Sequence, residues 1–262
     1  MLGAAGMSPT LAALIGGSVA AAATALGALP VLFVRGIGQR TQDALLGFGA
    51  GVMLAASAFS LVLPGIEAAR AQGAGPWGAG LIVGVAIILG AGLVMALDRL
   101  VPHEHFIKGP EGRSSHRLKR TWLFVFAICL HNLPEGLAIG VGFATGIAPG
   151  IALATGIAIQ DLPEGLVVAV ALIAAGYSRG RAVLVGMGSG LIEPIGALAG
   201  VSLVIAMPLL LPCGLGFAAG AMLFVVSHEI IPESHRQGHE NFATGGLMIG
   251  FVLMMVLDTA LG

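Results

Sequence analysis

The sequence predicts an all-α fold, a polytopic membrane protein in which eight transmembrane helices form one domain over residues 1–262. Of its 262 residues, 57% are hydrophobic and only 10% are charged, whereas soluble domains carry about 25% charged residues. The mean hydropathy is +0.99, so a soluble chain of this composition could not cover its surface with polar groups. The 42 glycines suit membrane helices, because small residues let helices approach one another closely.

Eight apolar runs are long enough to cross a membrane. A hydrocarbon core about 30 Å thick needs roughly 20 apolar residues per helix. The runs cover residues 8–34, 41–63, 77–97, 121–144, 149–175, 182–207, 211–231 and 242–261. The longest connection, at about 98–120, is polar and carries several histidines. Five pairs of glycines are spaced four apart within the runs, which predicts closely packed helix faces.

The basic residues predict the orientation of the helices. The chain has 12 Lys and Arg residues, and all of them except Arg70 fall in connections on one side of the predicted membrane or at their edges. Positive charge gathers on the cytoplasmic side. The connection at 98–120 is therefore expected in the cytoplasm and both termini outside it. The net charge of −1 gives no reason to expect a nucleic-acid partner.

Two related motifs interrupt the apolar pattern. "LHNLPEG" occupies residues 130–136, and "IQDLPEG" occupies residues 159–165. With one acid of the sixth run they place seven polar side chains at a similar depth: His131, Asn132, Glu135, Gln160, Asp161, Glu164 and Glu193. These runs have no interior Lys or Arg, and four acids at mid-membrane cost on the order of 10 kcal/mol. Bound cations or protons must offset that cost.

The spacing of these residues suits a metal site. His131 and Glu135 are four residues apart and share a helix face, and Gln160 and Glu164 repeat this geometry. A second stripe on each helix has a spacing of three, formed by Asn132 with Glu135 and by Asp161 with Glu164. Oxygen ligands with one imidazole suit Zn²⁺, Fe²⁺, Mn²⁺ or Cd²⁺. Facing helices could hold two metal ions that share both glutamates.

Prolines at the same depth predict distorted helices. Pro134 and Pro163 lie inside the motifs, and Pro194 follows Glu193. Each proline removes a backbone donor and frees a carbonyl one turn earlier, which kinks a helix. Interrupted helices near the bilayer midplane often build the ion sites of transporters. A buried polar network that only fixes helix packing is the structural alternative, which four acids without a cationic partner disfavour.

The paired motifs resemble those of the ZIP family of metal transporters (zinc- and iron-regulated transporter-like proteins), particularly its bacterial members. The resemblance extends over essentially the whole chain. It implies a single transmembrane transport domain in the inner (plasma) membrane, which brings Zn²⁺ or another divalent ion such as Cd²⁺ into the cytoplasm as a secondary transporter. It also implies that one helix bundle moves against another and that the chain assembles as a homodimer.

The resemblance also implies a ligand set for two metal ions. One ion would be held by His131, Glu135, Gln160 and Glu164, with Met53 of the second run nearby. The other would be held by Asn132, Glu135, Asp161, Glu164 and Glu193. Many relatives have histidine in place of Gln160, so this chain lacks one strong nitrogen ligand. One of the two ions could be a structural cofactor and not the transported substrate; the sequence leaves this open.

Other residues are weaker candidates for metal contacts. "SHEIIPE" at the end of the seventh run offers His228 and Glu229 as a metal exit station, and "PHEH" offers His103 and His105 for metal capture in the cytoplasm. In each case a solvated polar segment is the alternative. Met53 alone would be read as core packing.

Two other functional classes are compatible with a membrane metal site. A membrane-embedded di-metal enzyme would need further polar groups for its substrate, and none is left over. A cation channel would need a polar stripe along several helices, whereas the polar residues cluster at one level. The chain also has no G-x-x-x-x-G-K-[ST] motif, so no ATP-driven pump is indicated. Acids that release metal could take up protons, which would link transport to protons.

Overall fold

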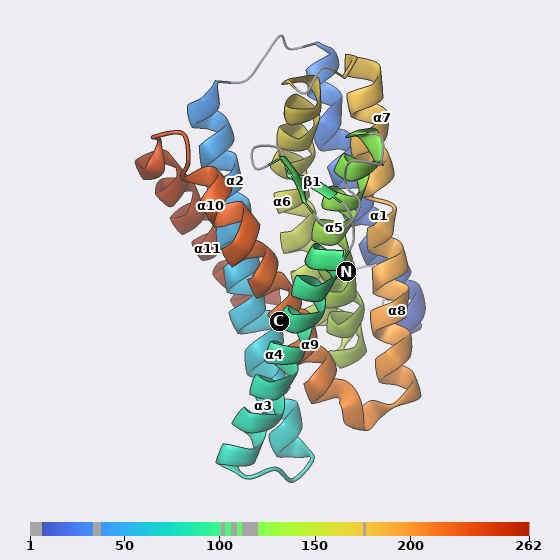
Figure 1. Ribbon diagram of the computed structural model, residues 1–262. Coiled ribbons are helices and arrows are strands. Elements are labelled where there is room, and N and C mark those ends of the chain that lie inside the picture. Colours follow the sequence, from blue (N-terminus) through green and yellow to red (C-terminus); the bar gives the residue numbers. More distant parts are fainter. Residues whose placement is uncertain are drawn as a thin grey trace.

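The computed structural model describes residues 7–33, 38–100, 103–105, 109–111, 120–174 and 177–261. Within these ranges it does not describe the side chains of residues 103–105, 109–111, 120–131, 171 and 174. His131, His103 and His105 are therefore placed by their backbone only. The described chain is almost entirely helical and forms an elongated bundle (Figure 1).

Eight membrane-crossing helical segments account for the fold. Seven of the described segments are long and apolar enough to span a bilayer: 9–32, 39–71, 76–100, 147–170, 179–206, 208–234 and 240–261. Helix α5, Arg120–Thr145, supplies the eighth with 26 residues, or about 39 Å of rise. The predicted all-α class with eight transmembrane helices is confirmed.

Several spans consist of more than one helical segment. The first contains α1 (Pro9–Ala28) and η1 (Leu29–Leu32), and α4 (Pro76–Leu100), α6 (Ile147–Ala174) and α11 (Glu240–Leu261) are single helices. The second contains α2 (Gln39–Ala55), η2 (Ala56–Val62) and α3 (Leu63–Ala71). The sixth contains α7 (Arg179–Ser189) and α8 (Ile192–Ala206). The seventh contains η4 (Pro208–Leu210), α9 (Leu211–Val225), η5 (Val226–Ile230) and α10 (Ile231–Ser234).

Helix α4 reaches into the connection that the sequence places at about 98–120. Helix α4 continues to Leu100, so Asp98 is a buried helical residue and not part of a loop. Two short strands, β1 (His103–His105) and β2 (Gly109–Glu111), pair antiparallel with His103 opposite Glu111. The candidate residues His103 and His105 thus lie in β1, but their side chains are outside the described part.

The helices respond to their prolines in different ways. Helices α5 and α6 each continue as one α-helix past Pro134 and Pro163. The sixth span instead breaks between α7 and α8, so that Glu193 lies in the first turn of α8. Segments η2 and η5 are π-helical and come just before Pro64 and Pro232. Such π segments arise where the regular hydrogen-bond ladder is interrupted, as at proline.

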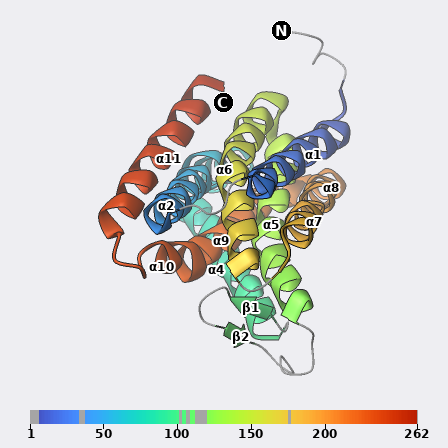
Figure 2. The same cartoon turned by 90° about the horizontal axis from the view of Figure 1, so that it is seen from above.

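Close helix pairing sets the positions of the motifs. The most extensive contacts join α2 with α11, α1 with α6, α5 with α8, and α4 with α9. From above, α2 and α11 lie together on one side, and α1 and α8 lie beside α5 and α6 on the other (Figure 2). A methyl group at Gly136 would collide with the carbonyl oxygen of Glu193. Glycine therefore allows α5 to approach α8 at the level of the motifs.

Candidate metal site

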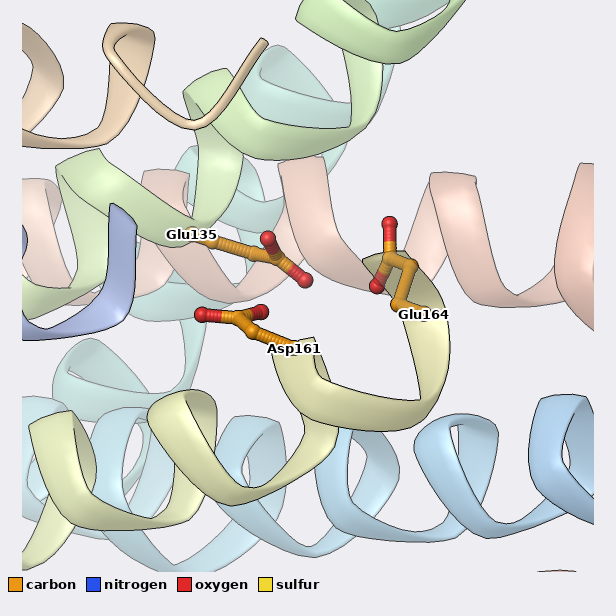
Figure 3. A group of neighbouring side chains, drawn as sticks. All are labelled: Glu135, Asp161 and Glu164. Atoms are coloured by element: carbon orange, nitrogen blue, oxygen red, sulfur yellow. The ribbon is translucent and has the colours of Figure 1, made fainter. Parts of the chain in front are cut away.

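Three acids from the two motifs converge between α5 and α6. Glu135 on α5 and Asp161 and Glu164 on α6 point toward a common space (Figure 3). One carboxylate oxygen from each acid lies within 4.8 Å of the other two. Glu135 and Asp161 are buried, and Glu164 is half-buried. Oxygens this close together can ligate one cation, which would also offset their mutual repulsion.

Glu193 completes the cluster from a third helix. It lies on α8 and contacts the first motif through Asn132. The Glu193 side chain is fully buried. Its Oε1 atom accepts hydrogen bonds from Nδ2 of Asn132 at 3.1 Å and from Oγ1 of Thr24 at 3.0 Å. The break before α8 brings this acid to the level of the two motifs.

The side-chain amides of Asn132 and Gln160 both donate hydrogen bonds to acids of the cluster. Gln160 donates from Nε2 to Oε1 of Glu135 and, at 3.4 Å, to Oδ1 of Asp161. The NH₂ group of Asn132 donates to Oε1 of Glu193. Each amide therefore neutralises part of the carboxylate charge and keeps its carbonyl oxygen for another partner. Asn132 and Gln160 are both buried.

Four buried oxygens of the cluster have no hydrogen-bond partner among the described residues. They are Oδ1 of Asn132, Oε1 of Gln160, Oδ2 of Asp161 and Oε2 of Glu193. Leaving a polar group buried and unpaired costs about 1–3 kcal/mol, and more if it is charged. A set of such oxygens from α5, α6 and α8 is the donor set that a hard or borderline divalent cation prefers. The residues present thus fit a metal ion as substrate.

The structure describes the surroundings of Met53 and His131 in less detail than those of the acids. The Met53 side chain is fully buried on α2. It follows Gly49 by one turn, and a Cβ at Gly49 would lie 3.6 Å from Oε1 of Gln160. Met53 therefore lies on the face of α2 that turns toward α6. The backbone of His131 lies in α5, four residues before Glu135, and its side chain is outside the described part.

The proposed exit residues lie in η5, away from this cluster in the chain. Nε2 of His228 is 4.0 Å from Oδ2 of Asp98, and its ring stacks on Phe224 with centroids 5.0 Å apart. The His228 side chain is 44% exposed, while Glu229 is buried. Asp98 was not a predicted candidate, because it looked like the start of a loop.

Several polar contacts outside the two motifs are visible only in the structure. Buried Asp43 on α2 accepts hydrogen bonds from Nε2 of Gln39 and from the His239 ring, each at 2.9 Å. Oγ of Ser60 donates to Oδ1 of Asp258 at 2.6 Å. Thr24 on α1 contacts Glu193 directly. Gln39 and Asp43 are one turn apart on α2. The other three contacts join segments far apart in the chain, and sequence spacing gives no signal for such pairs.

The fold and the site together define a class of protein. Helices that cross a membrane surround a buried group of acids and amide oxygens, which is the arrangement of a membrane protein that handles cations. Among the described residues, the acids of the two motifs form the cluster with metal-ligand spacing.

Comparison with known proteins gives the family. The family model described as "ZIP Zinc transporter" matches residues 104–258. Zinc transporter ZIPB of Bordetella bronchiseptica is 58% identical over 95% of this chain and 81% of its own length. Zinc transporter GufA of Myxococcus xanthus is 47% identical over 96% of this chain and 99% of its own, and zinc transporter ZupT of Chlorobium luteolum is 33% identical over 95% and 97%. The chain belongs to the ZIP family, and it is a multi-pass membrane transporter of divalent metal ions and not an enzyme.

Proposed function

We propose that the protein carries Zn²⁺ across the inner (plasma) membrane into the cytoplasm, as a secondary transporter, through the cluster between α5, α6 and α8. The observation that carries this proposal is the set of four buried oxygens that have no hydrogen-bond partner among the described residues, together with the three converging carboxylates. The names of the relatives favour zinc as the substrate. Cd²⁺, Fe²⁺ and Mn²⁺ share the required ligand chemistry and are the further substrates to test.

The cluster is proposed to be binuclear. His131, Glu135, Gln160 and Glu164 would hold one ion, with Met53 as a nearby soft ligand. Asn132, Glu135, Asp161, Glu164 and Glu193 would hold the other. The 4.8 Å grouping of Glu135, Asp161 and Glu164 supports this sharing, because both glutamates belong to both sets. One of the two ions is proposed to be a resident structural ion and the other the transported substrate, which is tested by counting ions bound per chain before and after transport.

A path toward the cytoplasm is proposed from the basic connections. With both termini outside, η5 lies at the cytoplasmic end of its span. His228 and Glu229, with Asp98 beside His228, would then receive metal that leaves the central cluster, and His103 and His105 would capture it weakly. Cysteine labelling of the two termini from outside intact cells tests the orientation. Labelled termini in intact cells agree with it, and labelling only after lysis contradicts it.

Metal uptake into proteoliposomes tests the proposed function. Glu164→Ala and His131→Ala each remove a proposed ligand, so Zn²⁺ and Cd²⁺ uptake should fall to the level of empty liposomes. The assay is run with and without an imposed pH gradient, and transport linked to protons should respond to the gradient. Met7→Ala, at the edge of the core and far along the chain from the motifs, is the matched control. Full uptake by both ligand variants would show that the metal takes another route.

A homodimer is proposed from the family resemblance. The mass of the purified protein in detergent, measured by light scattering with correction for bound detergent, tests it. Two chains per particle is the expected result, and one chain per particle at all concentrations contradicts it.

A further inference from the structure

Thr24 is the one residue of α1 whose side chain reaches an acid of the proposed site within the described part of the chain. Its hydroxyl Oγ1 lies 3.0 Å from Oε1 of Glu193 and 3.3 Å from the Ala20 carbonyl oxygen. A hydroxyl has one proton to donate, and the shorter contact to a carboxylate is the stronger choice. The side chain is 4% exposed, so water does not compete for this hydrogen bond.

The surroundings of Thr24 hold it in this position. A Cβ at Gly165, the residue after Glu164, would collide with the Thr24 carbonyl oxygen. A Cβ at Gly190, in the break before α8, would lie 3.3 Å from the Thr24 Cβ. Thr24 is therefore packed between α6 and the start of α8. Its backbone is fixed by helix contacts, which leaves its hydroxyl in a defined place.

The hydrogen bond from Thr24 gives the two carboxylate oxygens of Glu193 different roles. Oε1 accepts from both Thr24 and Asn132, which come from different helices. Oε2 has no hydrogen-bond partner in the described residues. Two donors from different helices on one oxygen restrain the carboxylate, which leaves the other oxygen in a set orientation. A ligand held in place before the ion arrives loses less conformational freedom on binding.

We propose that Thr24 is a positioning residue for metal binding: its hydroxyl orients Glu193 so that Oε2 faces the divalent cation. This inference rests on the proposed function of the cluster as a metal site. It concerns a residue outside both motifs, on a helix that supplies none of the proposed ligands. Loss of the hydroxyl should weaken metal binding while the later steps of transport continue.

The test compares Thr24→Val with Thr24→Ser. Valine keeps the shape of threonine and lacks the hydroxyl, whereas serine keeps the hydroxyl. In Zn²⁺ uptake by proteoliposomes, Thr24→Val should raise the half-saturating concentration by about tenfold, the loss expected for one hydrogen bond to a charged group. The maximal rate should change by less than about twofold, and Thr24→Ser should behave as the natural chain does. Calorimetric titration of the purified protein with Zn²⁺ should show the same weakening in binding.

Two further variants serve as controls. Thr145→Val removes a hydroxyl that bonds only the Gly142 carbonyl of its own helix, at 2.7 Å, and should leave uptake unchanged. Thr24→Ala also lacks the hydroxyl and replaces Thr24→Val if the latter does not elute as a folded protein. Half-saturation as in the natural chain for both hydroxyl-free variants overturns the proposal. Equal loss in Thr24→Ser and Thr24→Val also overturns it, because packing would then be the cause.

Failure of this inference and failure of the proposed function give different results. If Glu193→Gln and Glu164→Ala lose uptake while Thr24→Val keeps normal half-saturation, only the role of Thr24 is wrong. If Glu193→Gln and Glu164→Ala both transport normally, the cluster is not the metal path, and the proposed role of Thr24 is then wrong as well.

Discussion

At the scale of single residues, the amides Asn132 and Gln160 have two functions. Their NH₂ groups donate to Glu193, Glu135 and Asp161 and so stabilise carboxylates in a buried place. Their carbonyl oxygens have no hydrogen-bond partner in the described chain. A histidine would offer one nitrogen ligand but could not both donate to two acids and offer an oxygen. An amide thus suits a site that must be stable both with and without its ion.

Gln160→His should change how tightly the site holds zinc. The imidazole adds a nitrogen ligand that Zn²⁺ favours over an amide oxygen. We expect the half-saturating Zn²⁺ concentration to fall by roughly tenfold, equivalent to about 1.4 kcal/mol of binding free energy. The maximal rate should fall as well, since release becomes slower. Zinc uptake in proteoliposomes measures both quantities.

Gln72→His is the control for this change. Gln72 is exposed at the end of α3 and bonds the Pro208 carbonyl oxygen, so its replacement should leave uptake as it was. Weaker zinc binding by Gln160→His would mean that the hydrogen bonds of Gln160 matter more than its place beside the ion.

The sequence predicts the acids of the site better than it predicts their partners. Glu135, Asp161 and Glu164 stand out because ionisable residues in apolar runs are rare and costly, and the structure brings them together. Thr24 gives no such signal. A hydroxyl in a helix can bond its own backbone, as Ser18 and Ser189 do, so only the packing of α1 against α8 reveals that Thr24 bonds Glu193.

At the scale of helices, the site depends on how closely α5 and α8 approach. Gly136 and Gly140 on α5 face the backbone of α8 at Glu193 and Ala197. The spacing of four between the glycines predicts a close contact, but not which helix makes it. The π segments η2 and η5 were not predicted either, because an extra residue in one turn does not alter an apolar run. Pro64 and Pro232 just after them were the available signal.

Gly136→Ala should therefore destabilise the protein. The added methyl group meets the Glu193 carbonyl, backbone that cannot rotate away. Overpacking of this kind costs about 1–3 kcal/mol, and it should also displace Glu193 and reduce zinc uptake. Thermal unfolding of the purified protein in detergent, followed by circular dichroism, measures the loss as a lower midpoint.

Gly84→Ala offers a matched comparison within a helix. A Cβ at Gly84 on α4 meets no atom within 4 Å, so alanine there should be neutral or slightly stabilising. If Gly136→Ala unfolds at the same temperature as Gly84→Ala, then α5 and α8 do not pack as closely at Gly136 as the structure indicates.

At the scale of the whole molecule, the second and last spans hold each other at both ends. Helix α2 packs along α11. Near one end of the pair, buried Asp43 receives a hydrogen bond from His239, and near the other Ser60 in η2 bonds Asp258. These pairs join residues 196 and 198 positions apart in the chain. Polar contacts thus fix the register of the two helices in a largely apolar bundle.

His239→Ala should weaken this connection. Asp43 is fully buried, and it would retain Gln39 as its hydrogen-bond donor while losing the imidazole. An under-satisfied buried oxygen costs about 1–3 kcal/mol, so the unfolding midpoint should drop. The control is Glu240→Gln, a change at the next, exposed residue, which should leave the midpoint in place. Equal midpoints for the two variants would show that the Asp43 contact adds no stability.

The pairing of α2 with α11 also bears on how the chain is made. Residues leave the ribosome in order, so Asp43 and Ser60 enter the membrane long before His239 and Asp258 exist. Until then the second span carries a buried acid in α2 and a buried hydroxyl in η2 that lack their final partners, a costly state in a lipid environment. Synthesis of the last span relieves that cost, and it makes the carboxyl-terminal helix the step that locks the register of the second. A chain that stopped before residue 239 would contain both motifs and Glu193 and still lack the partners of Asp43 and Ser60.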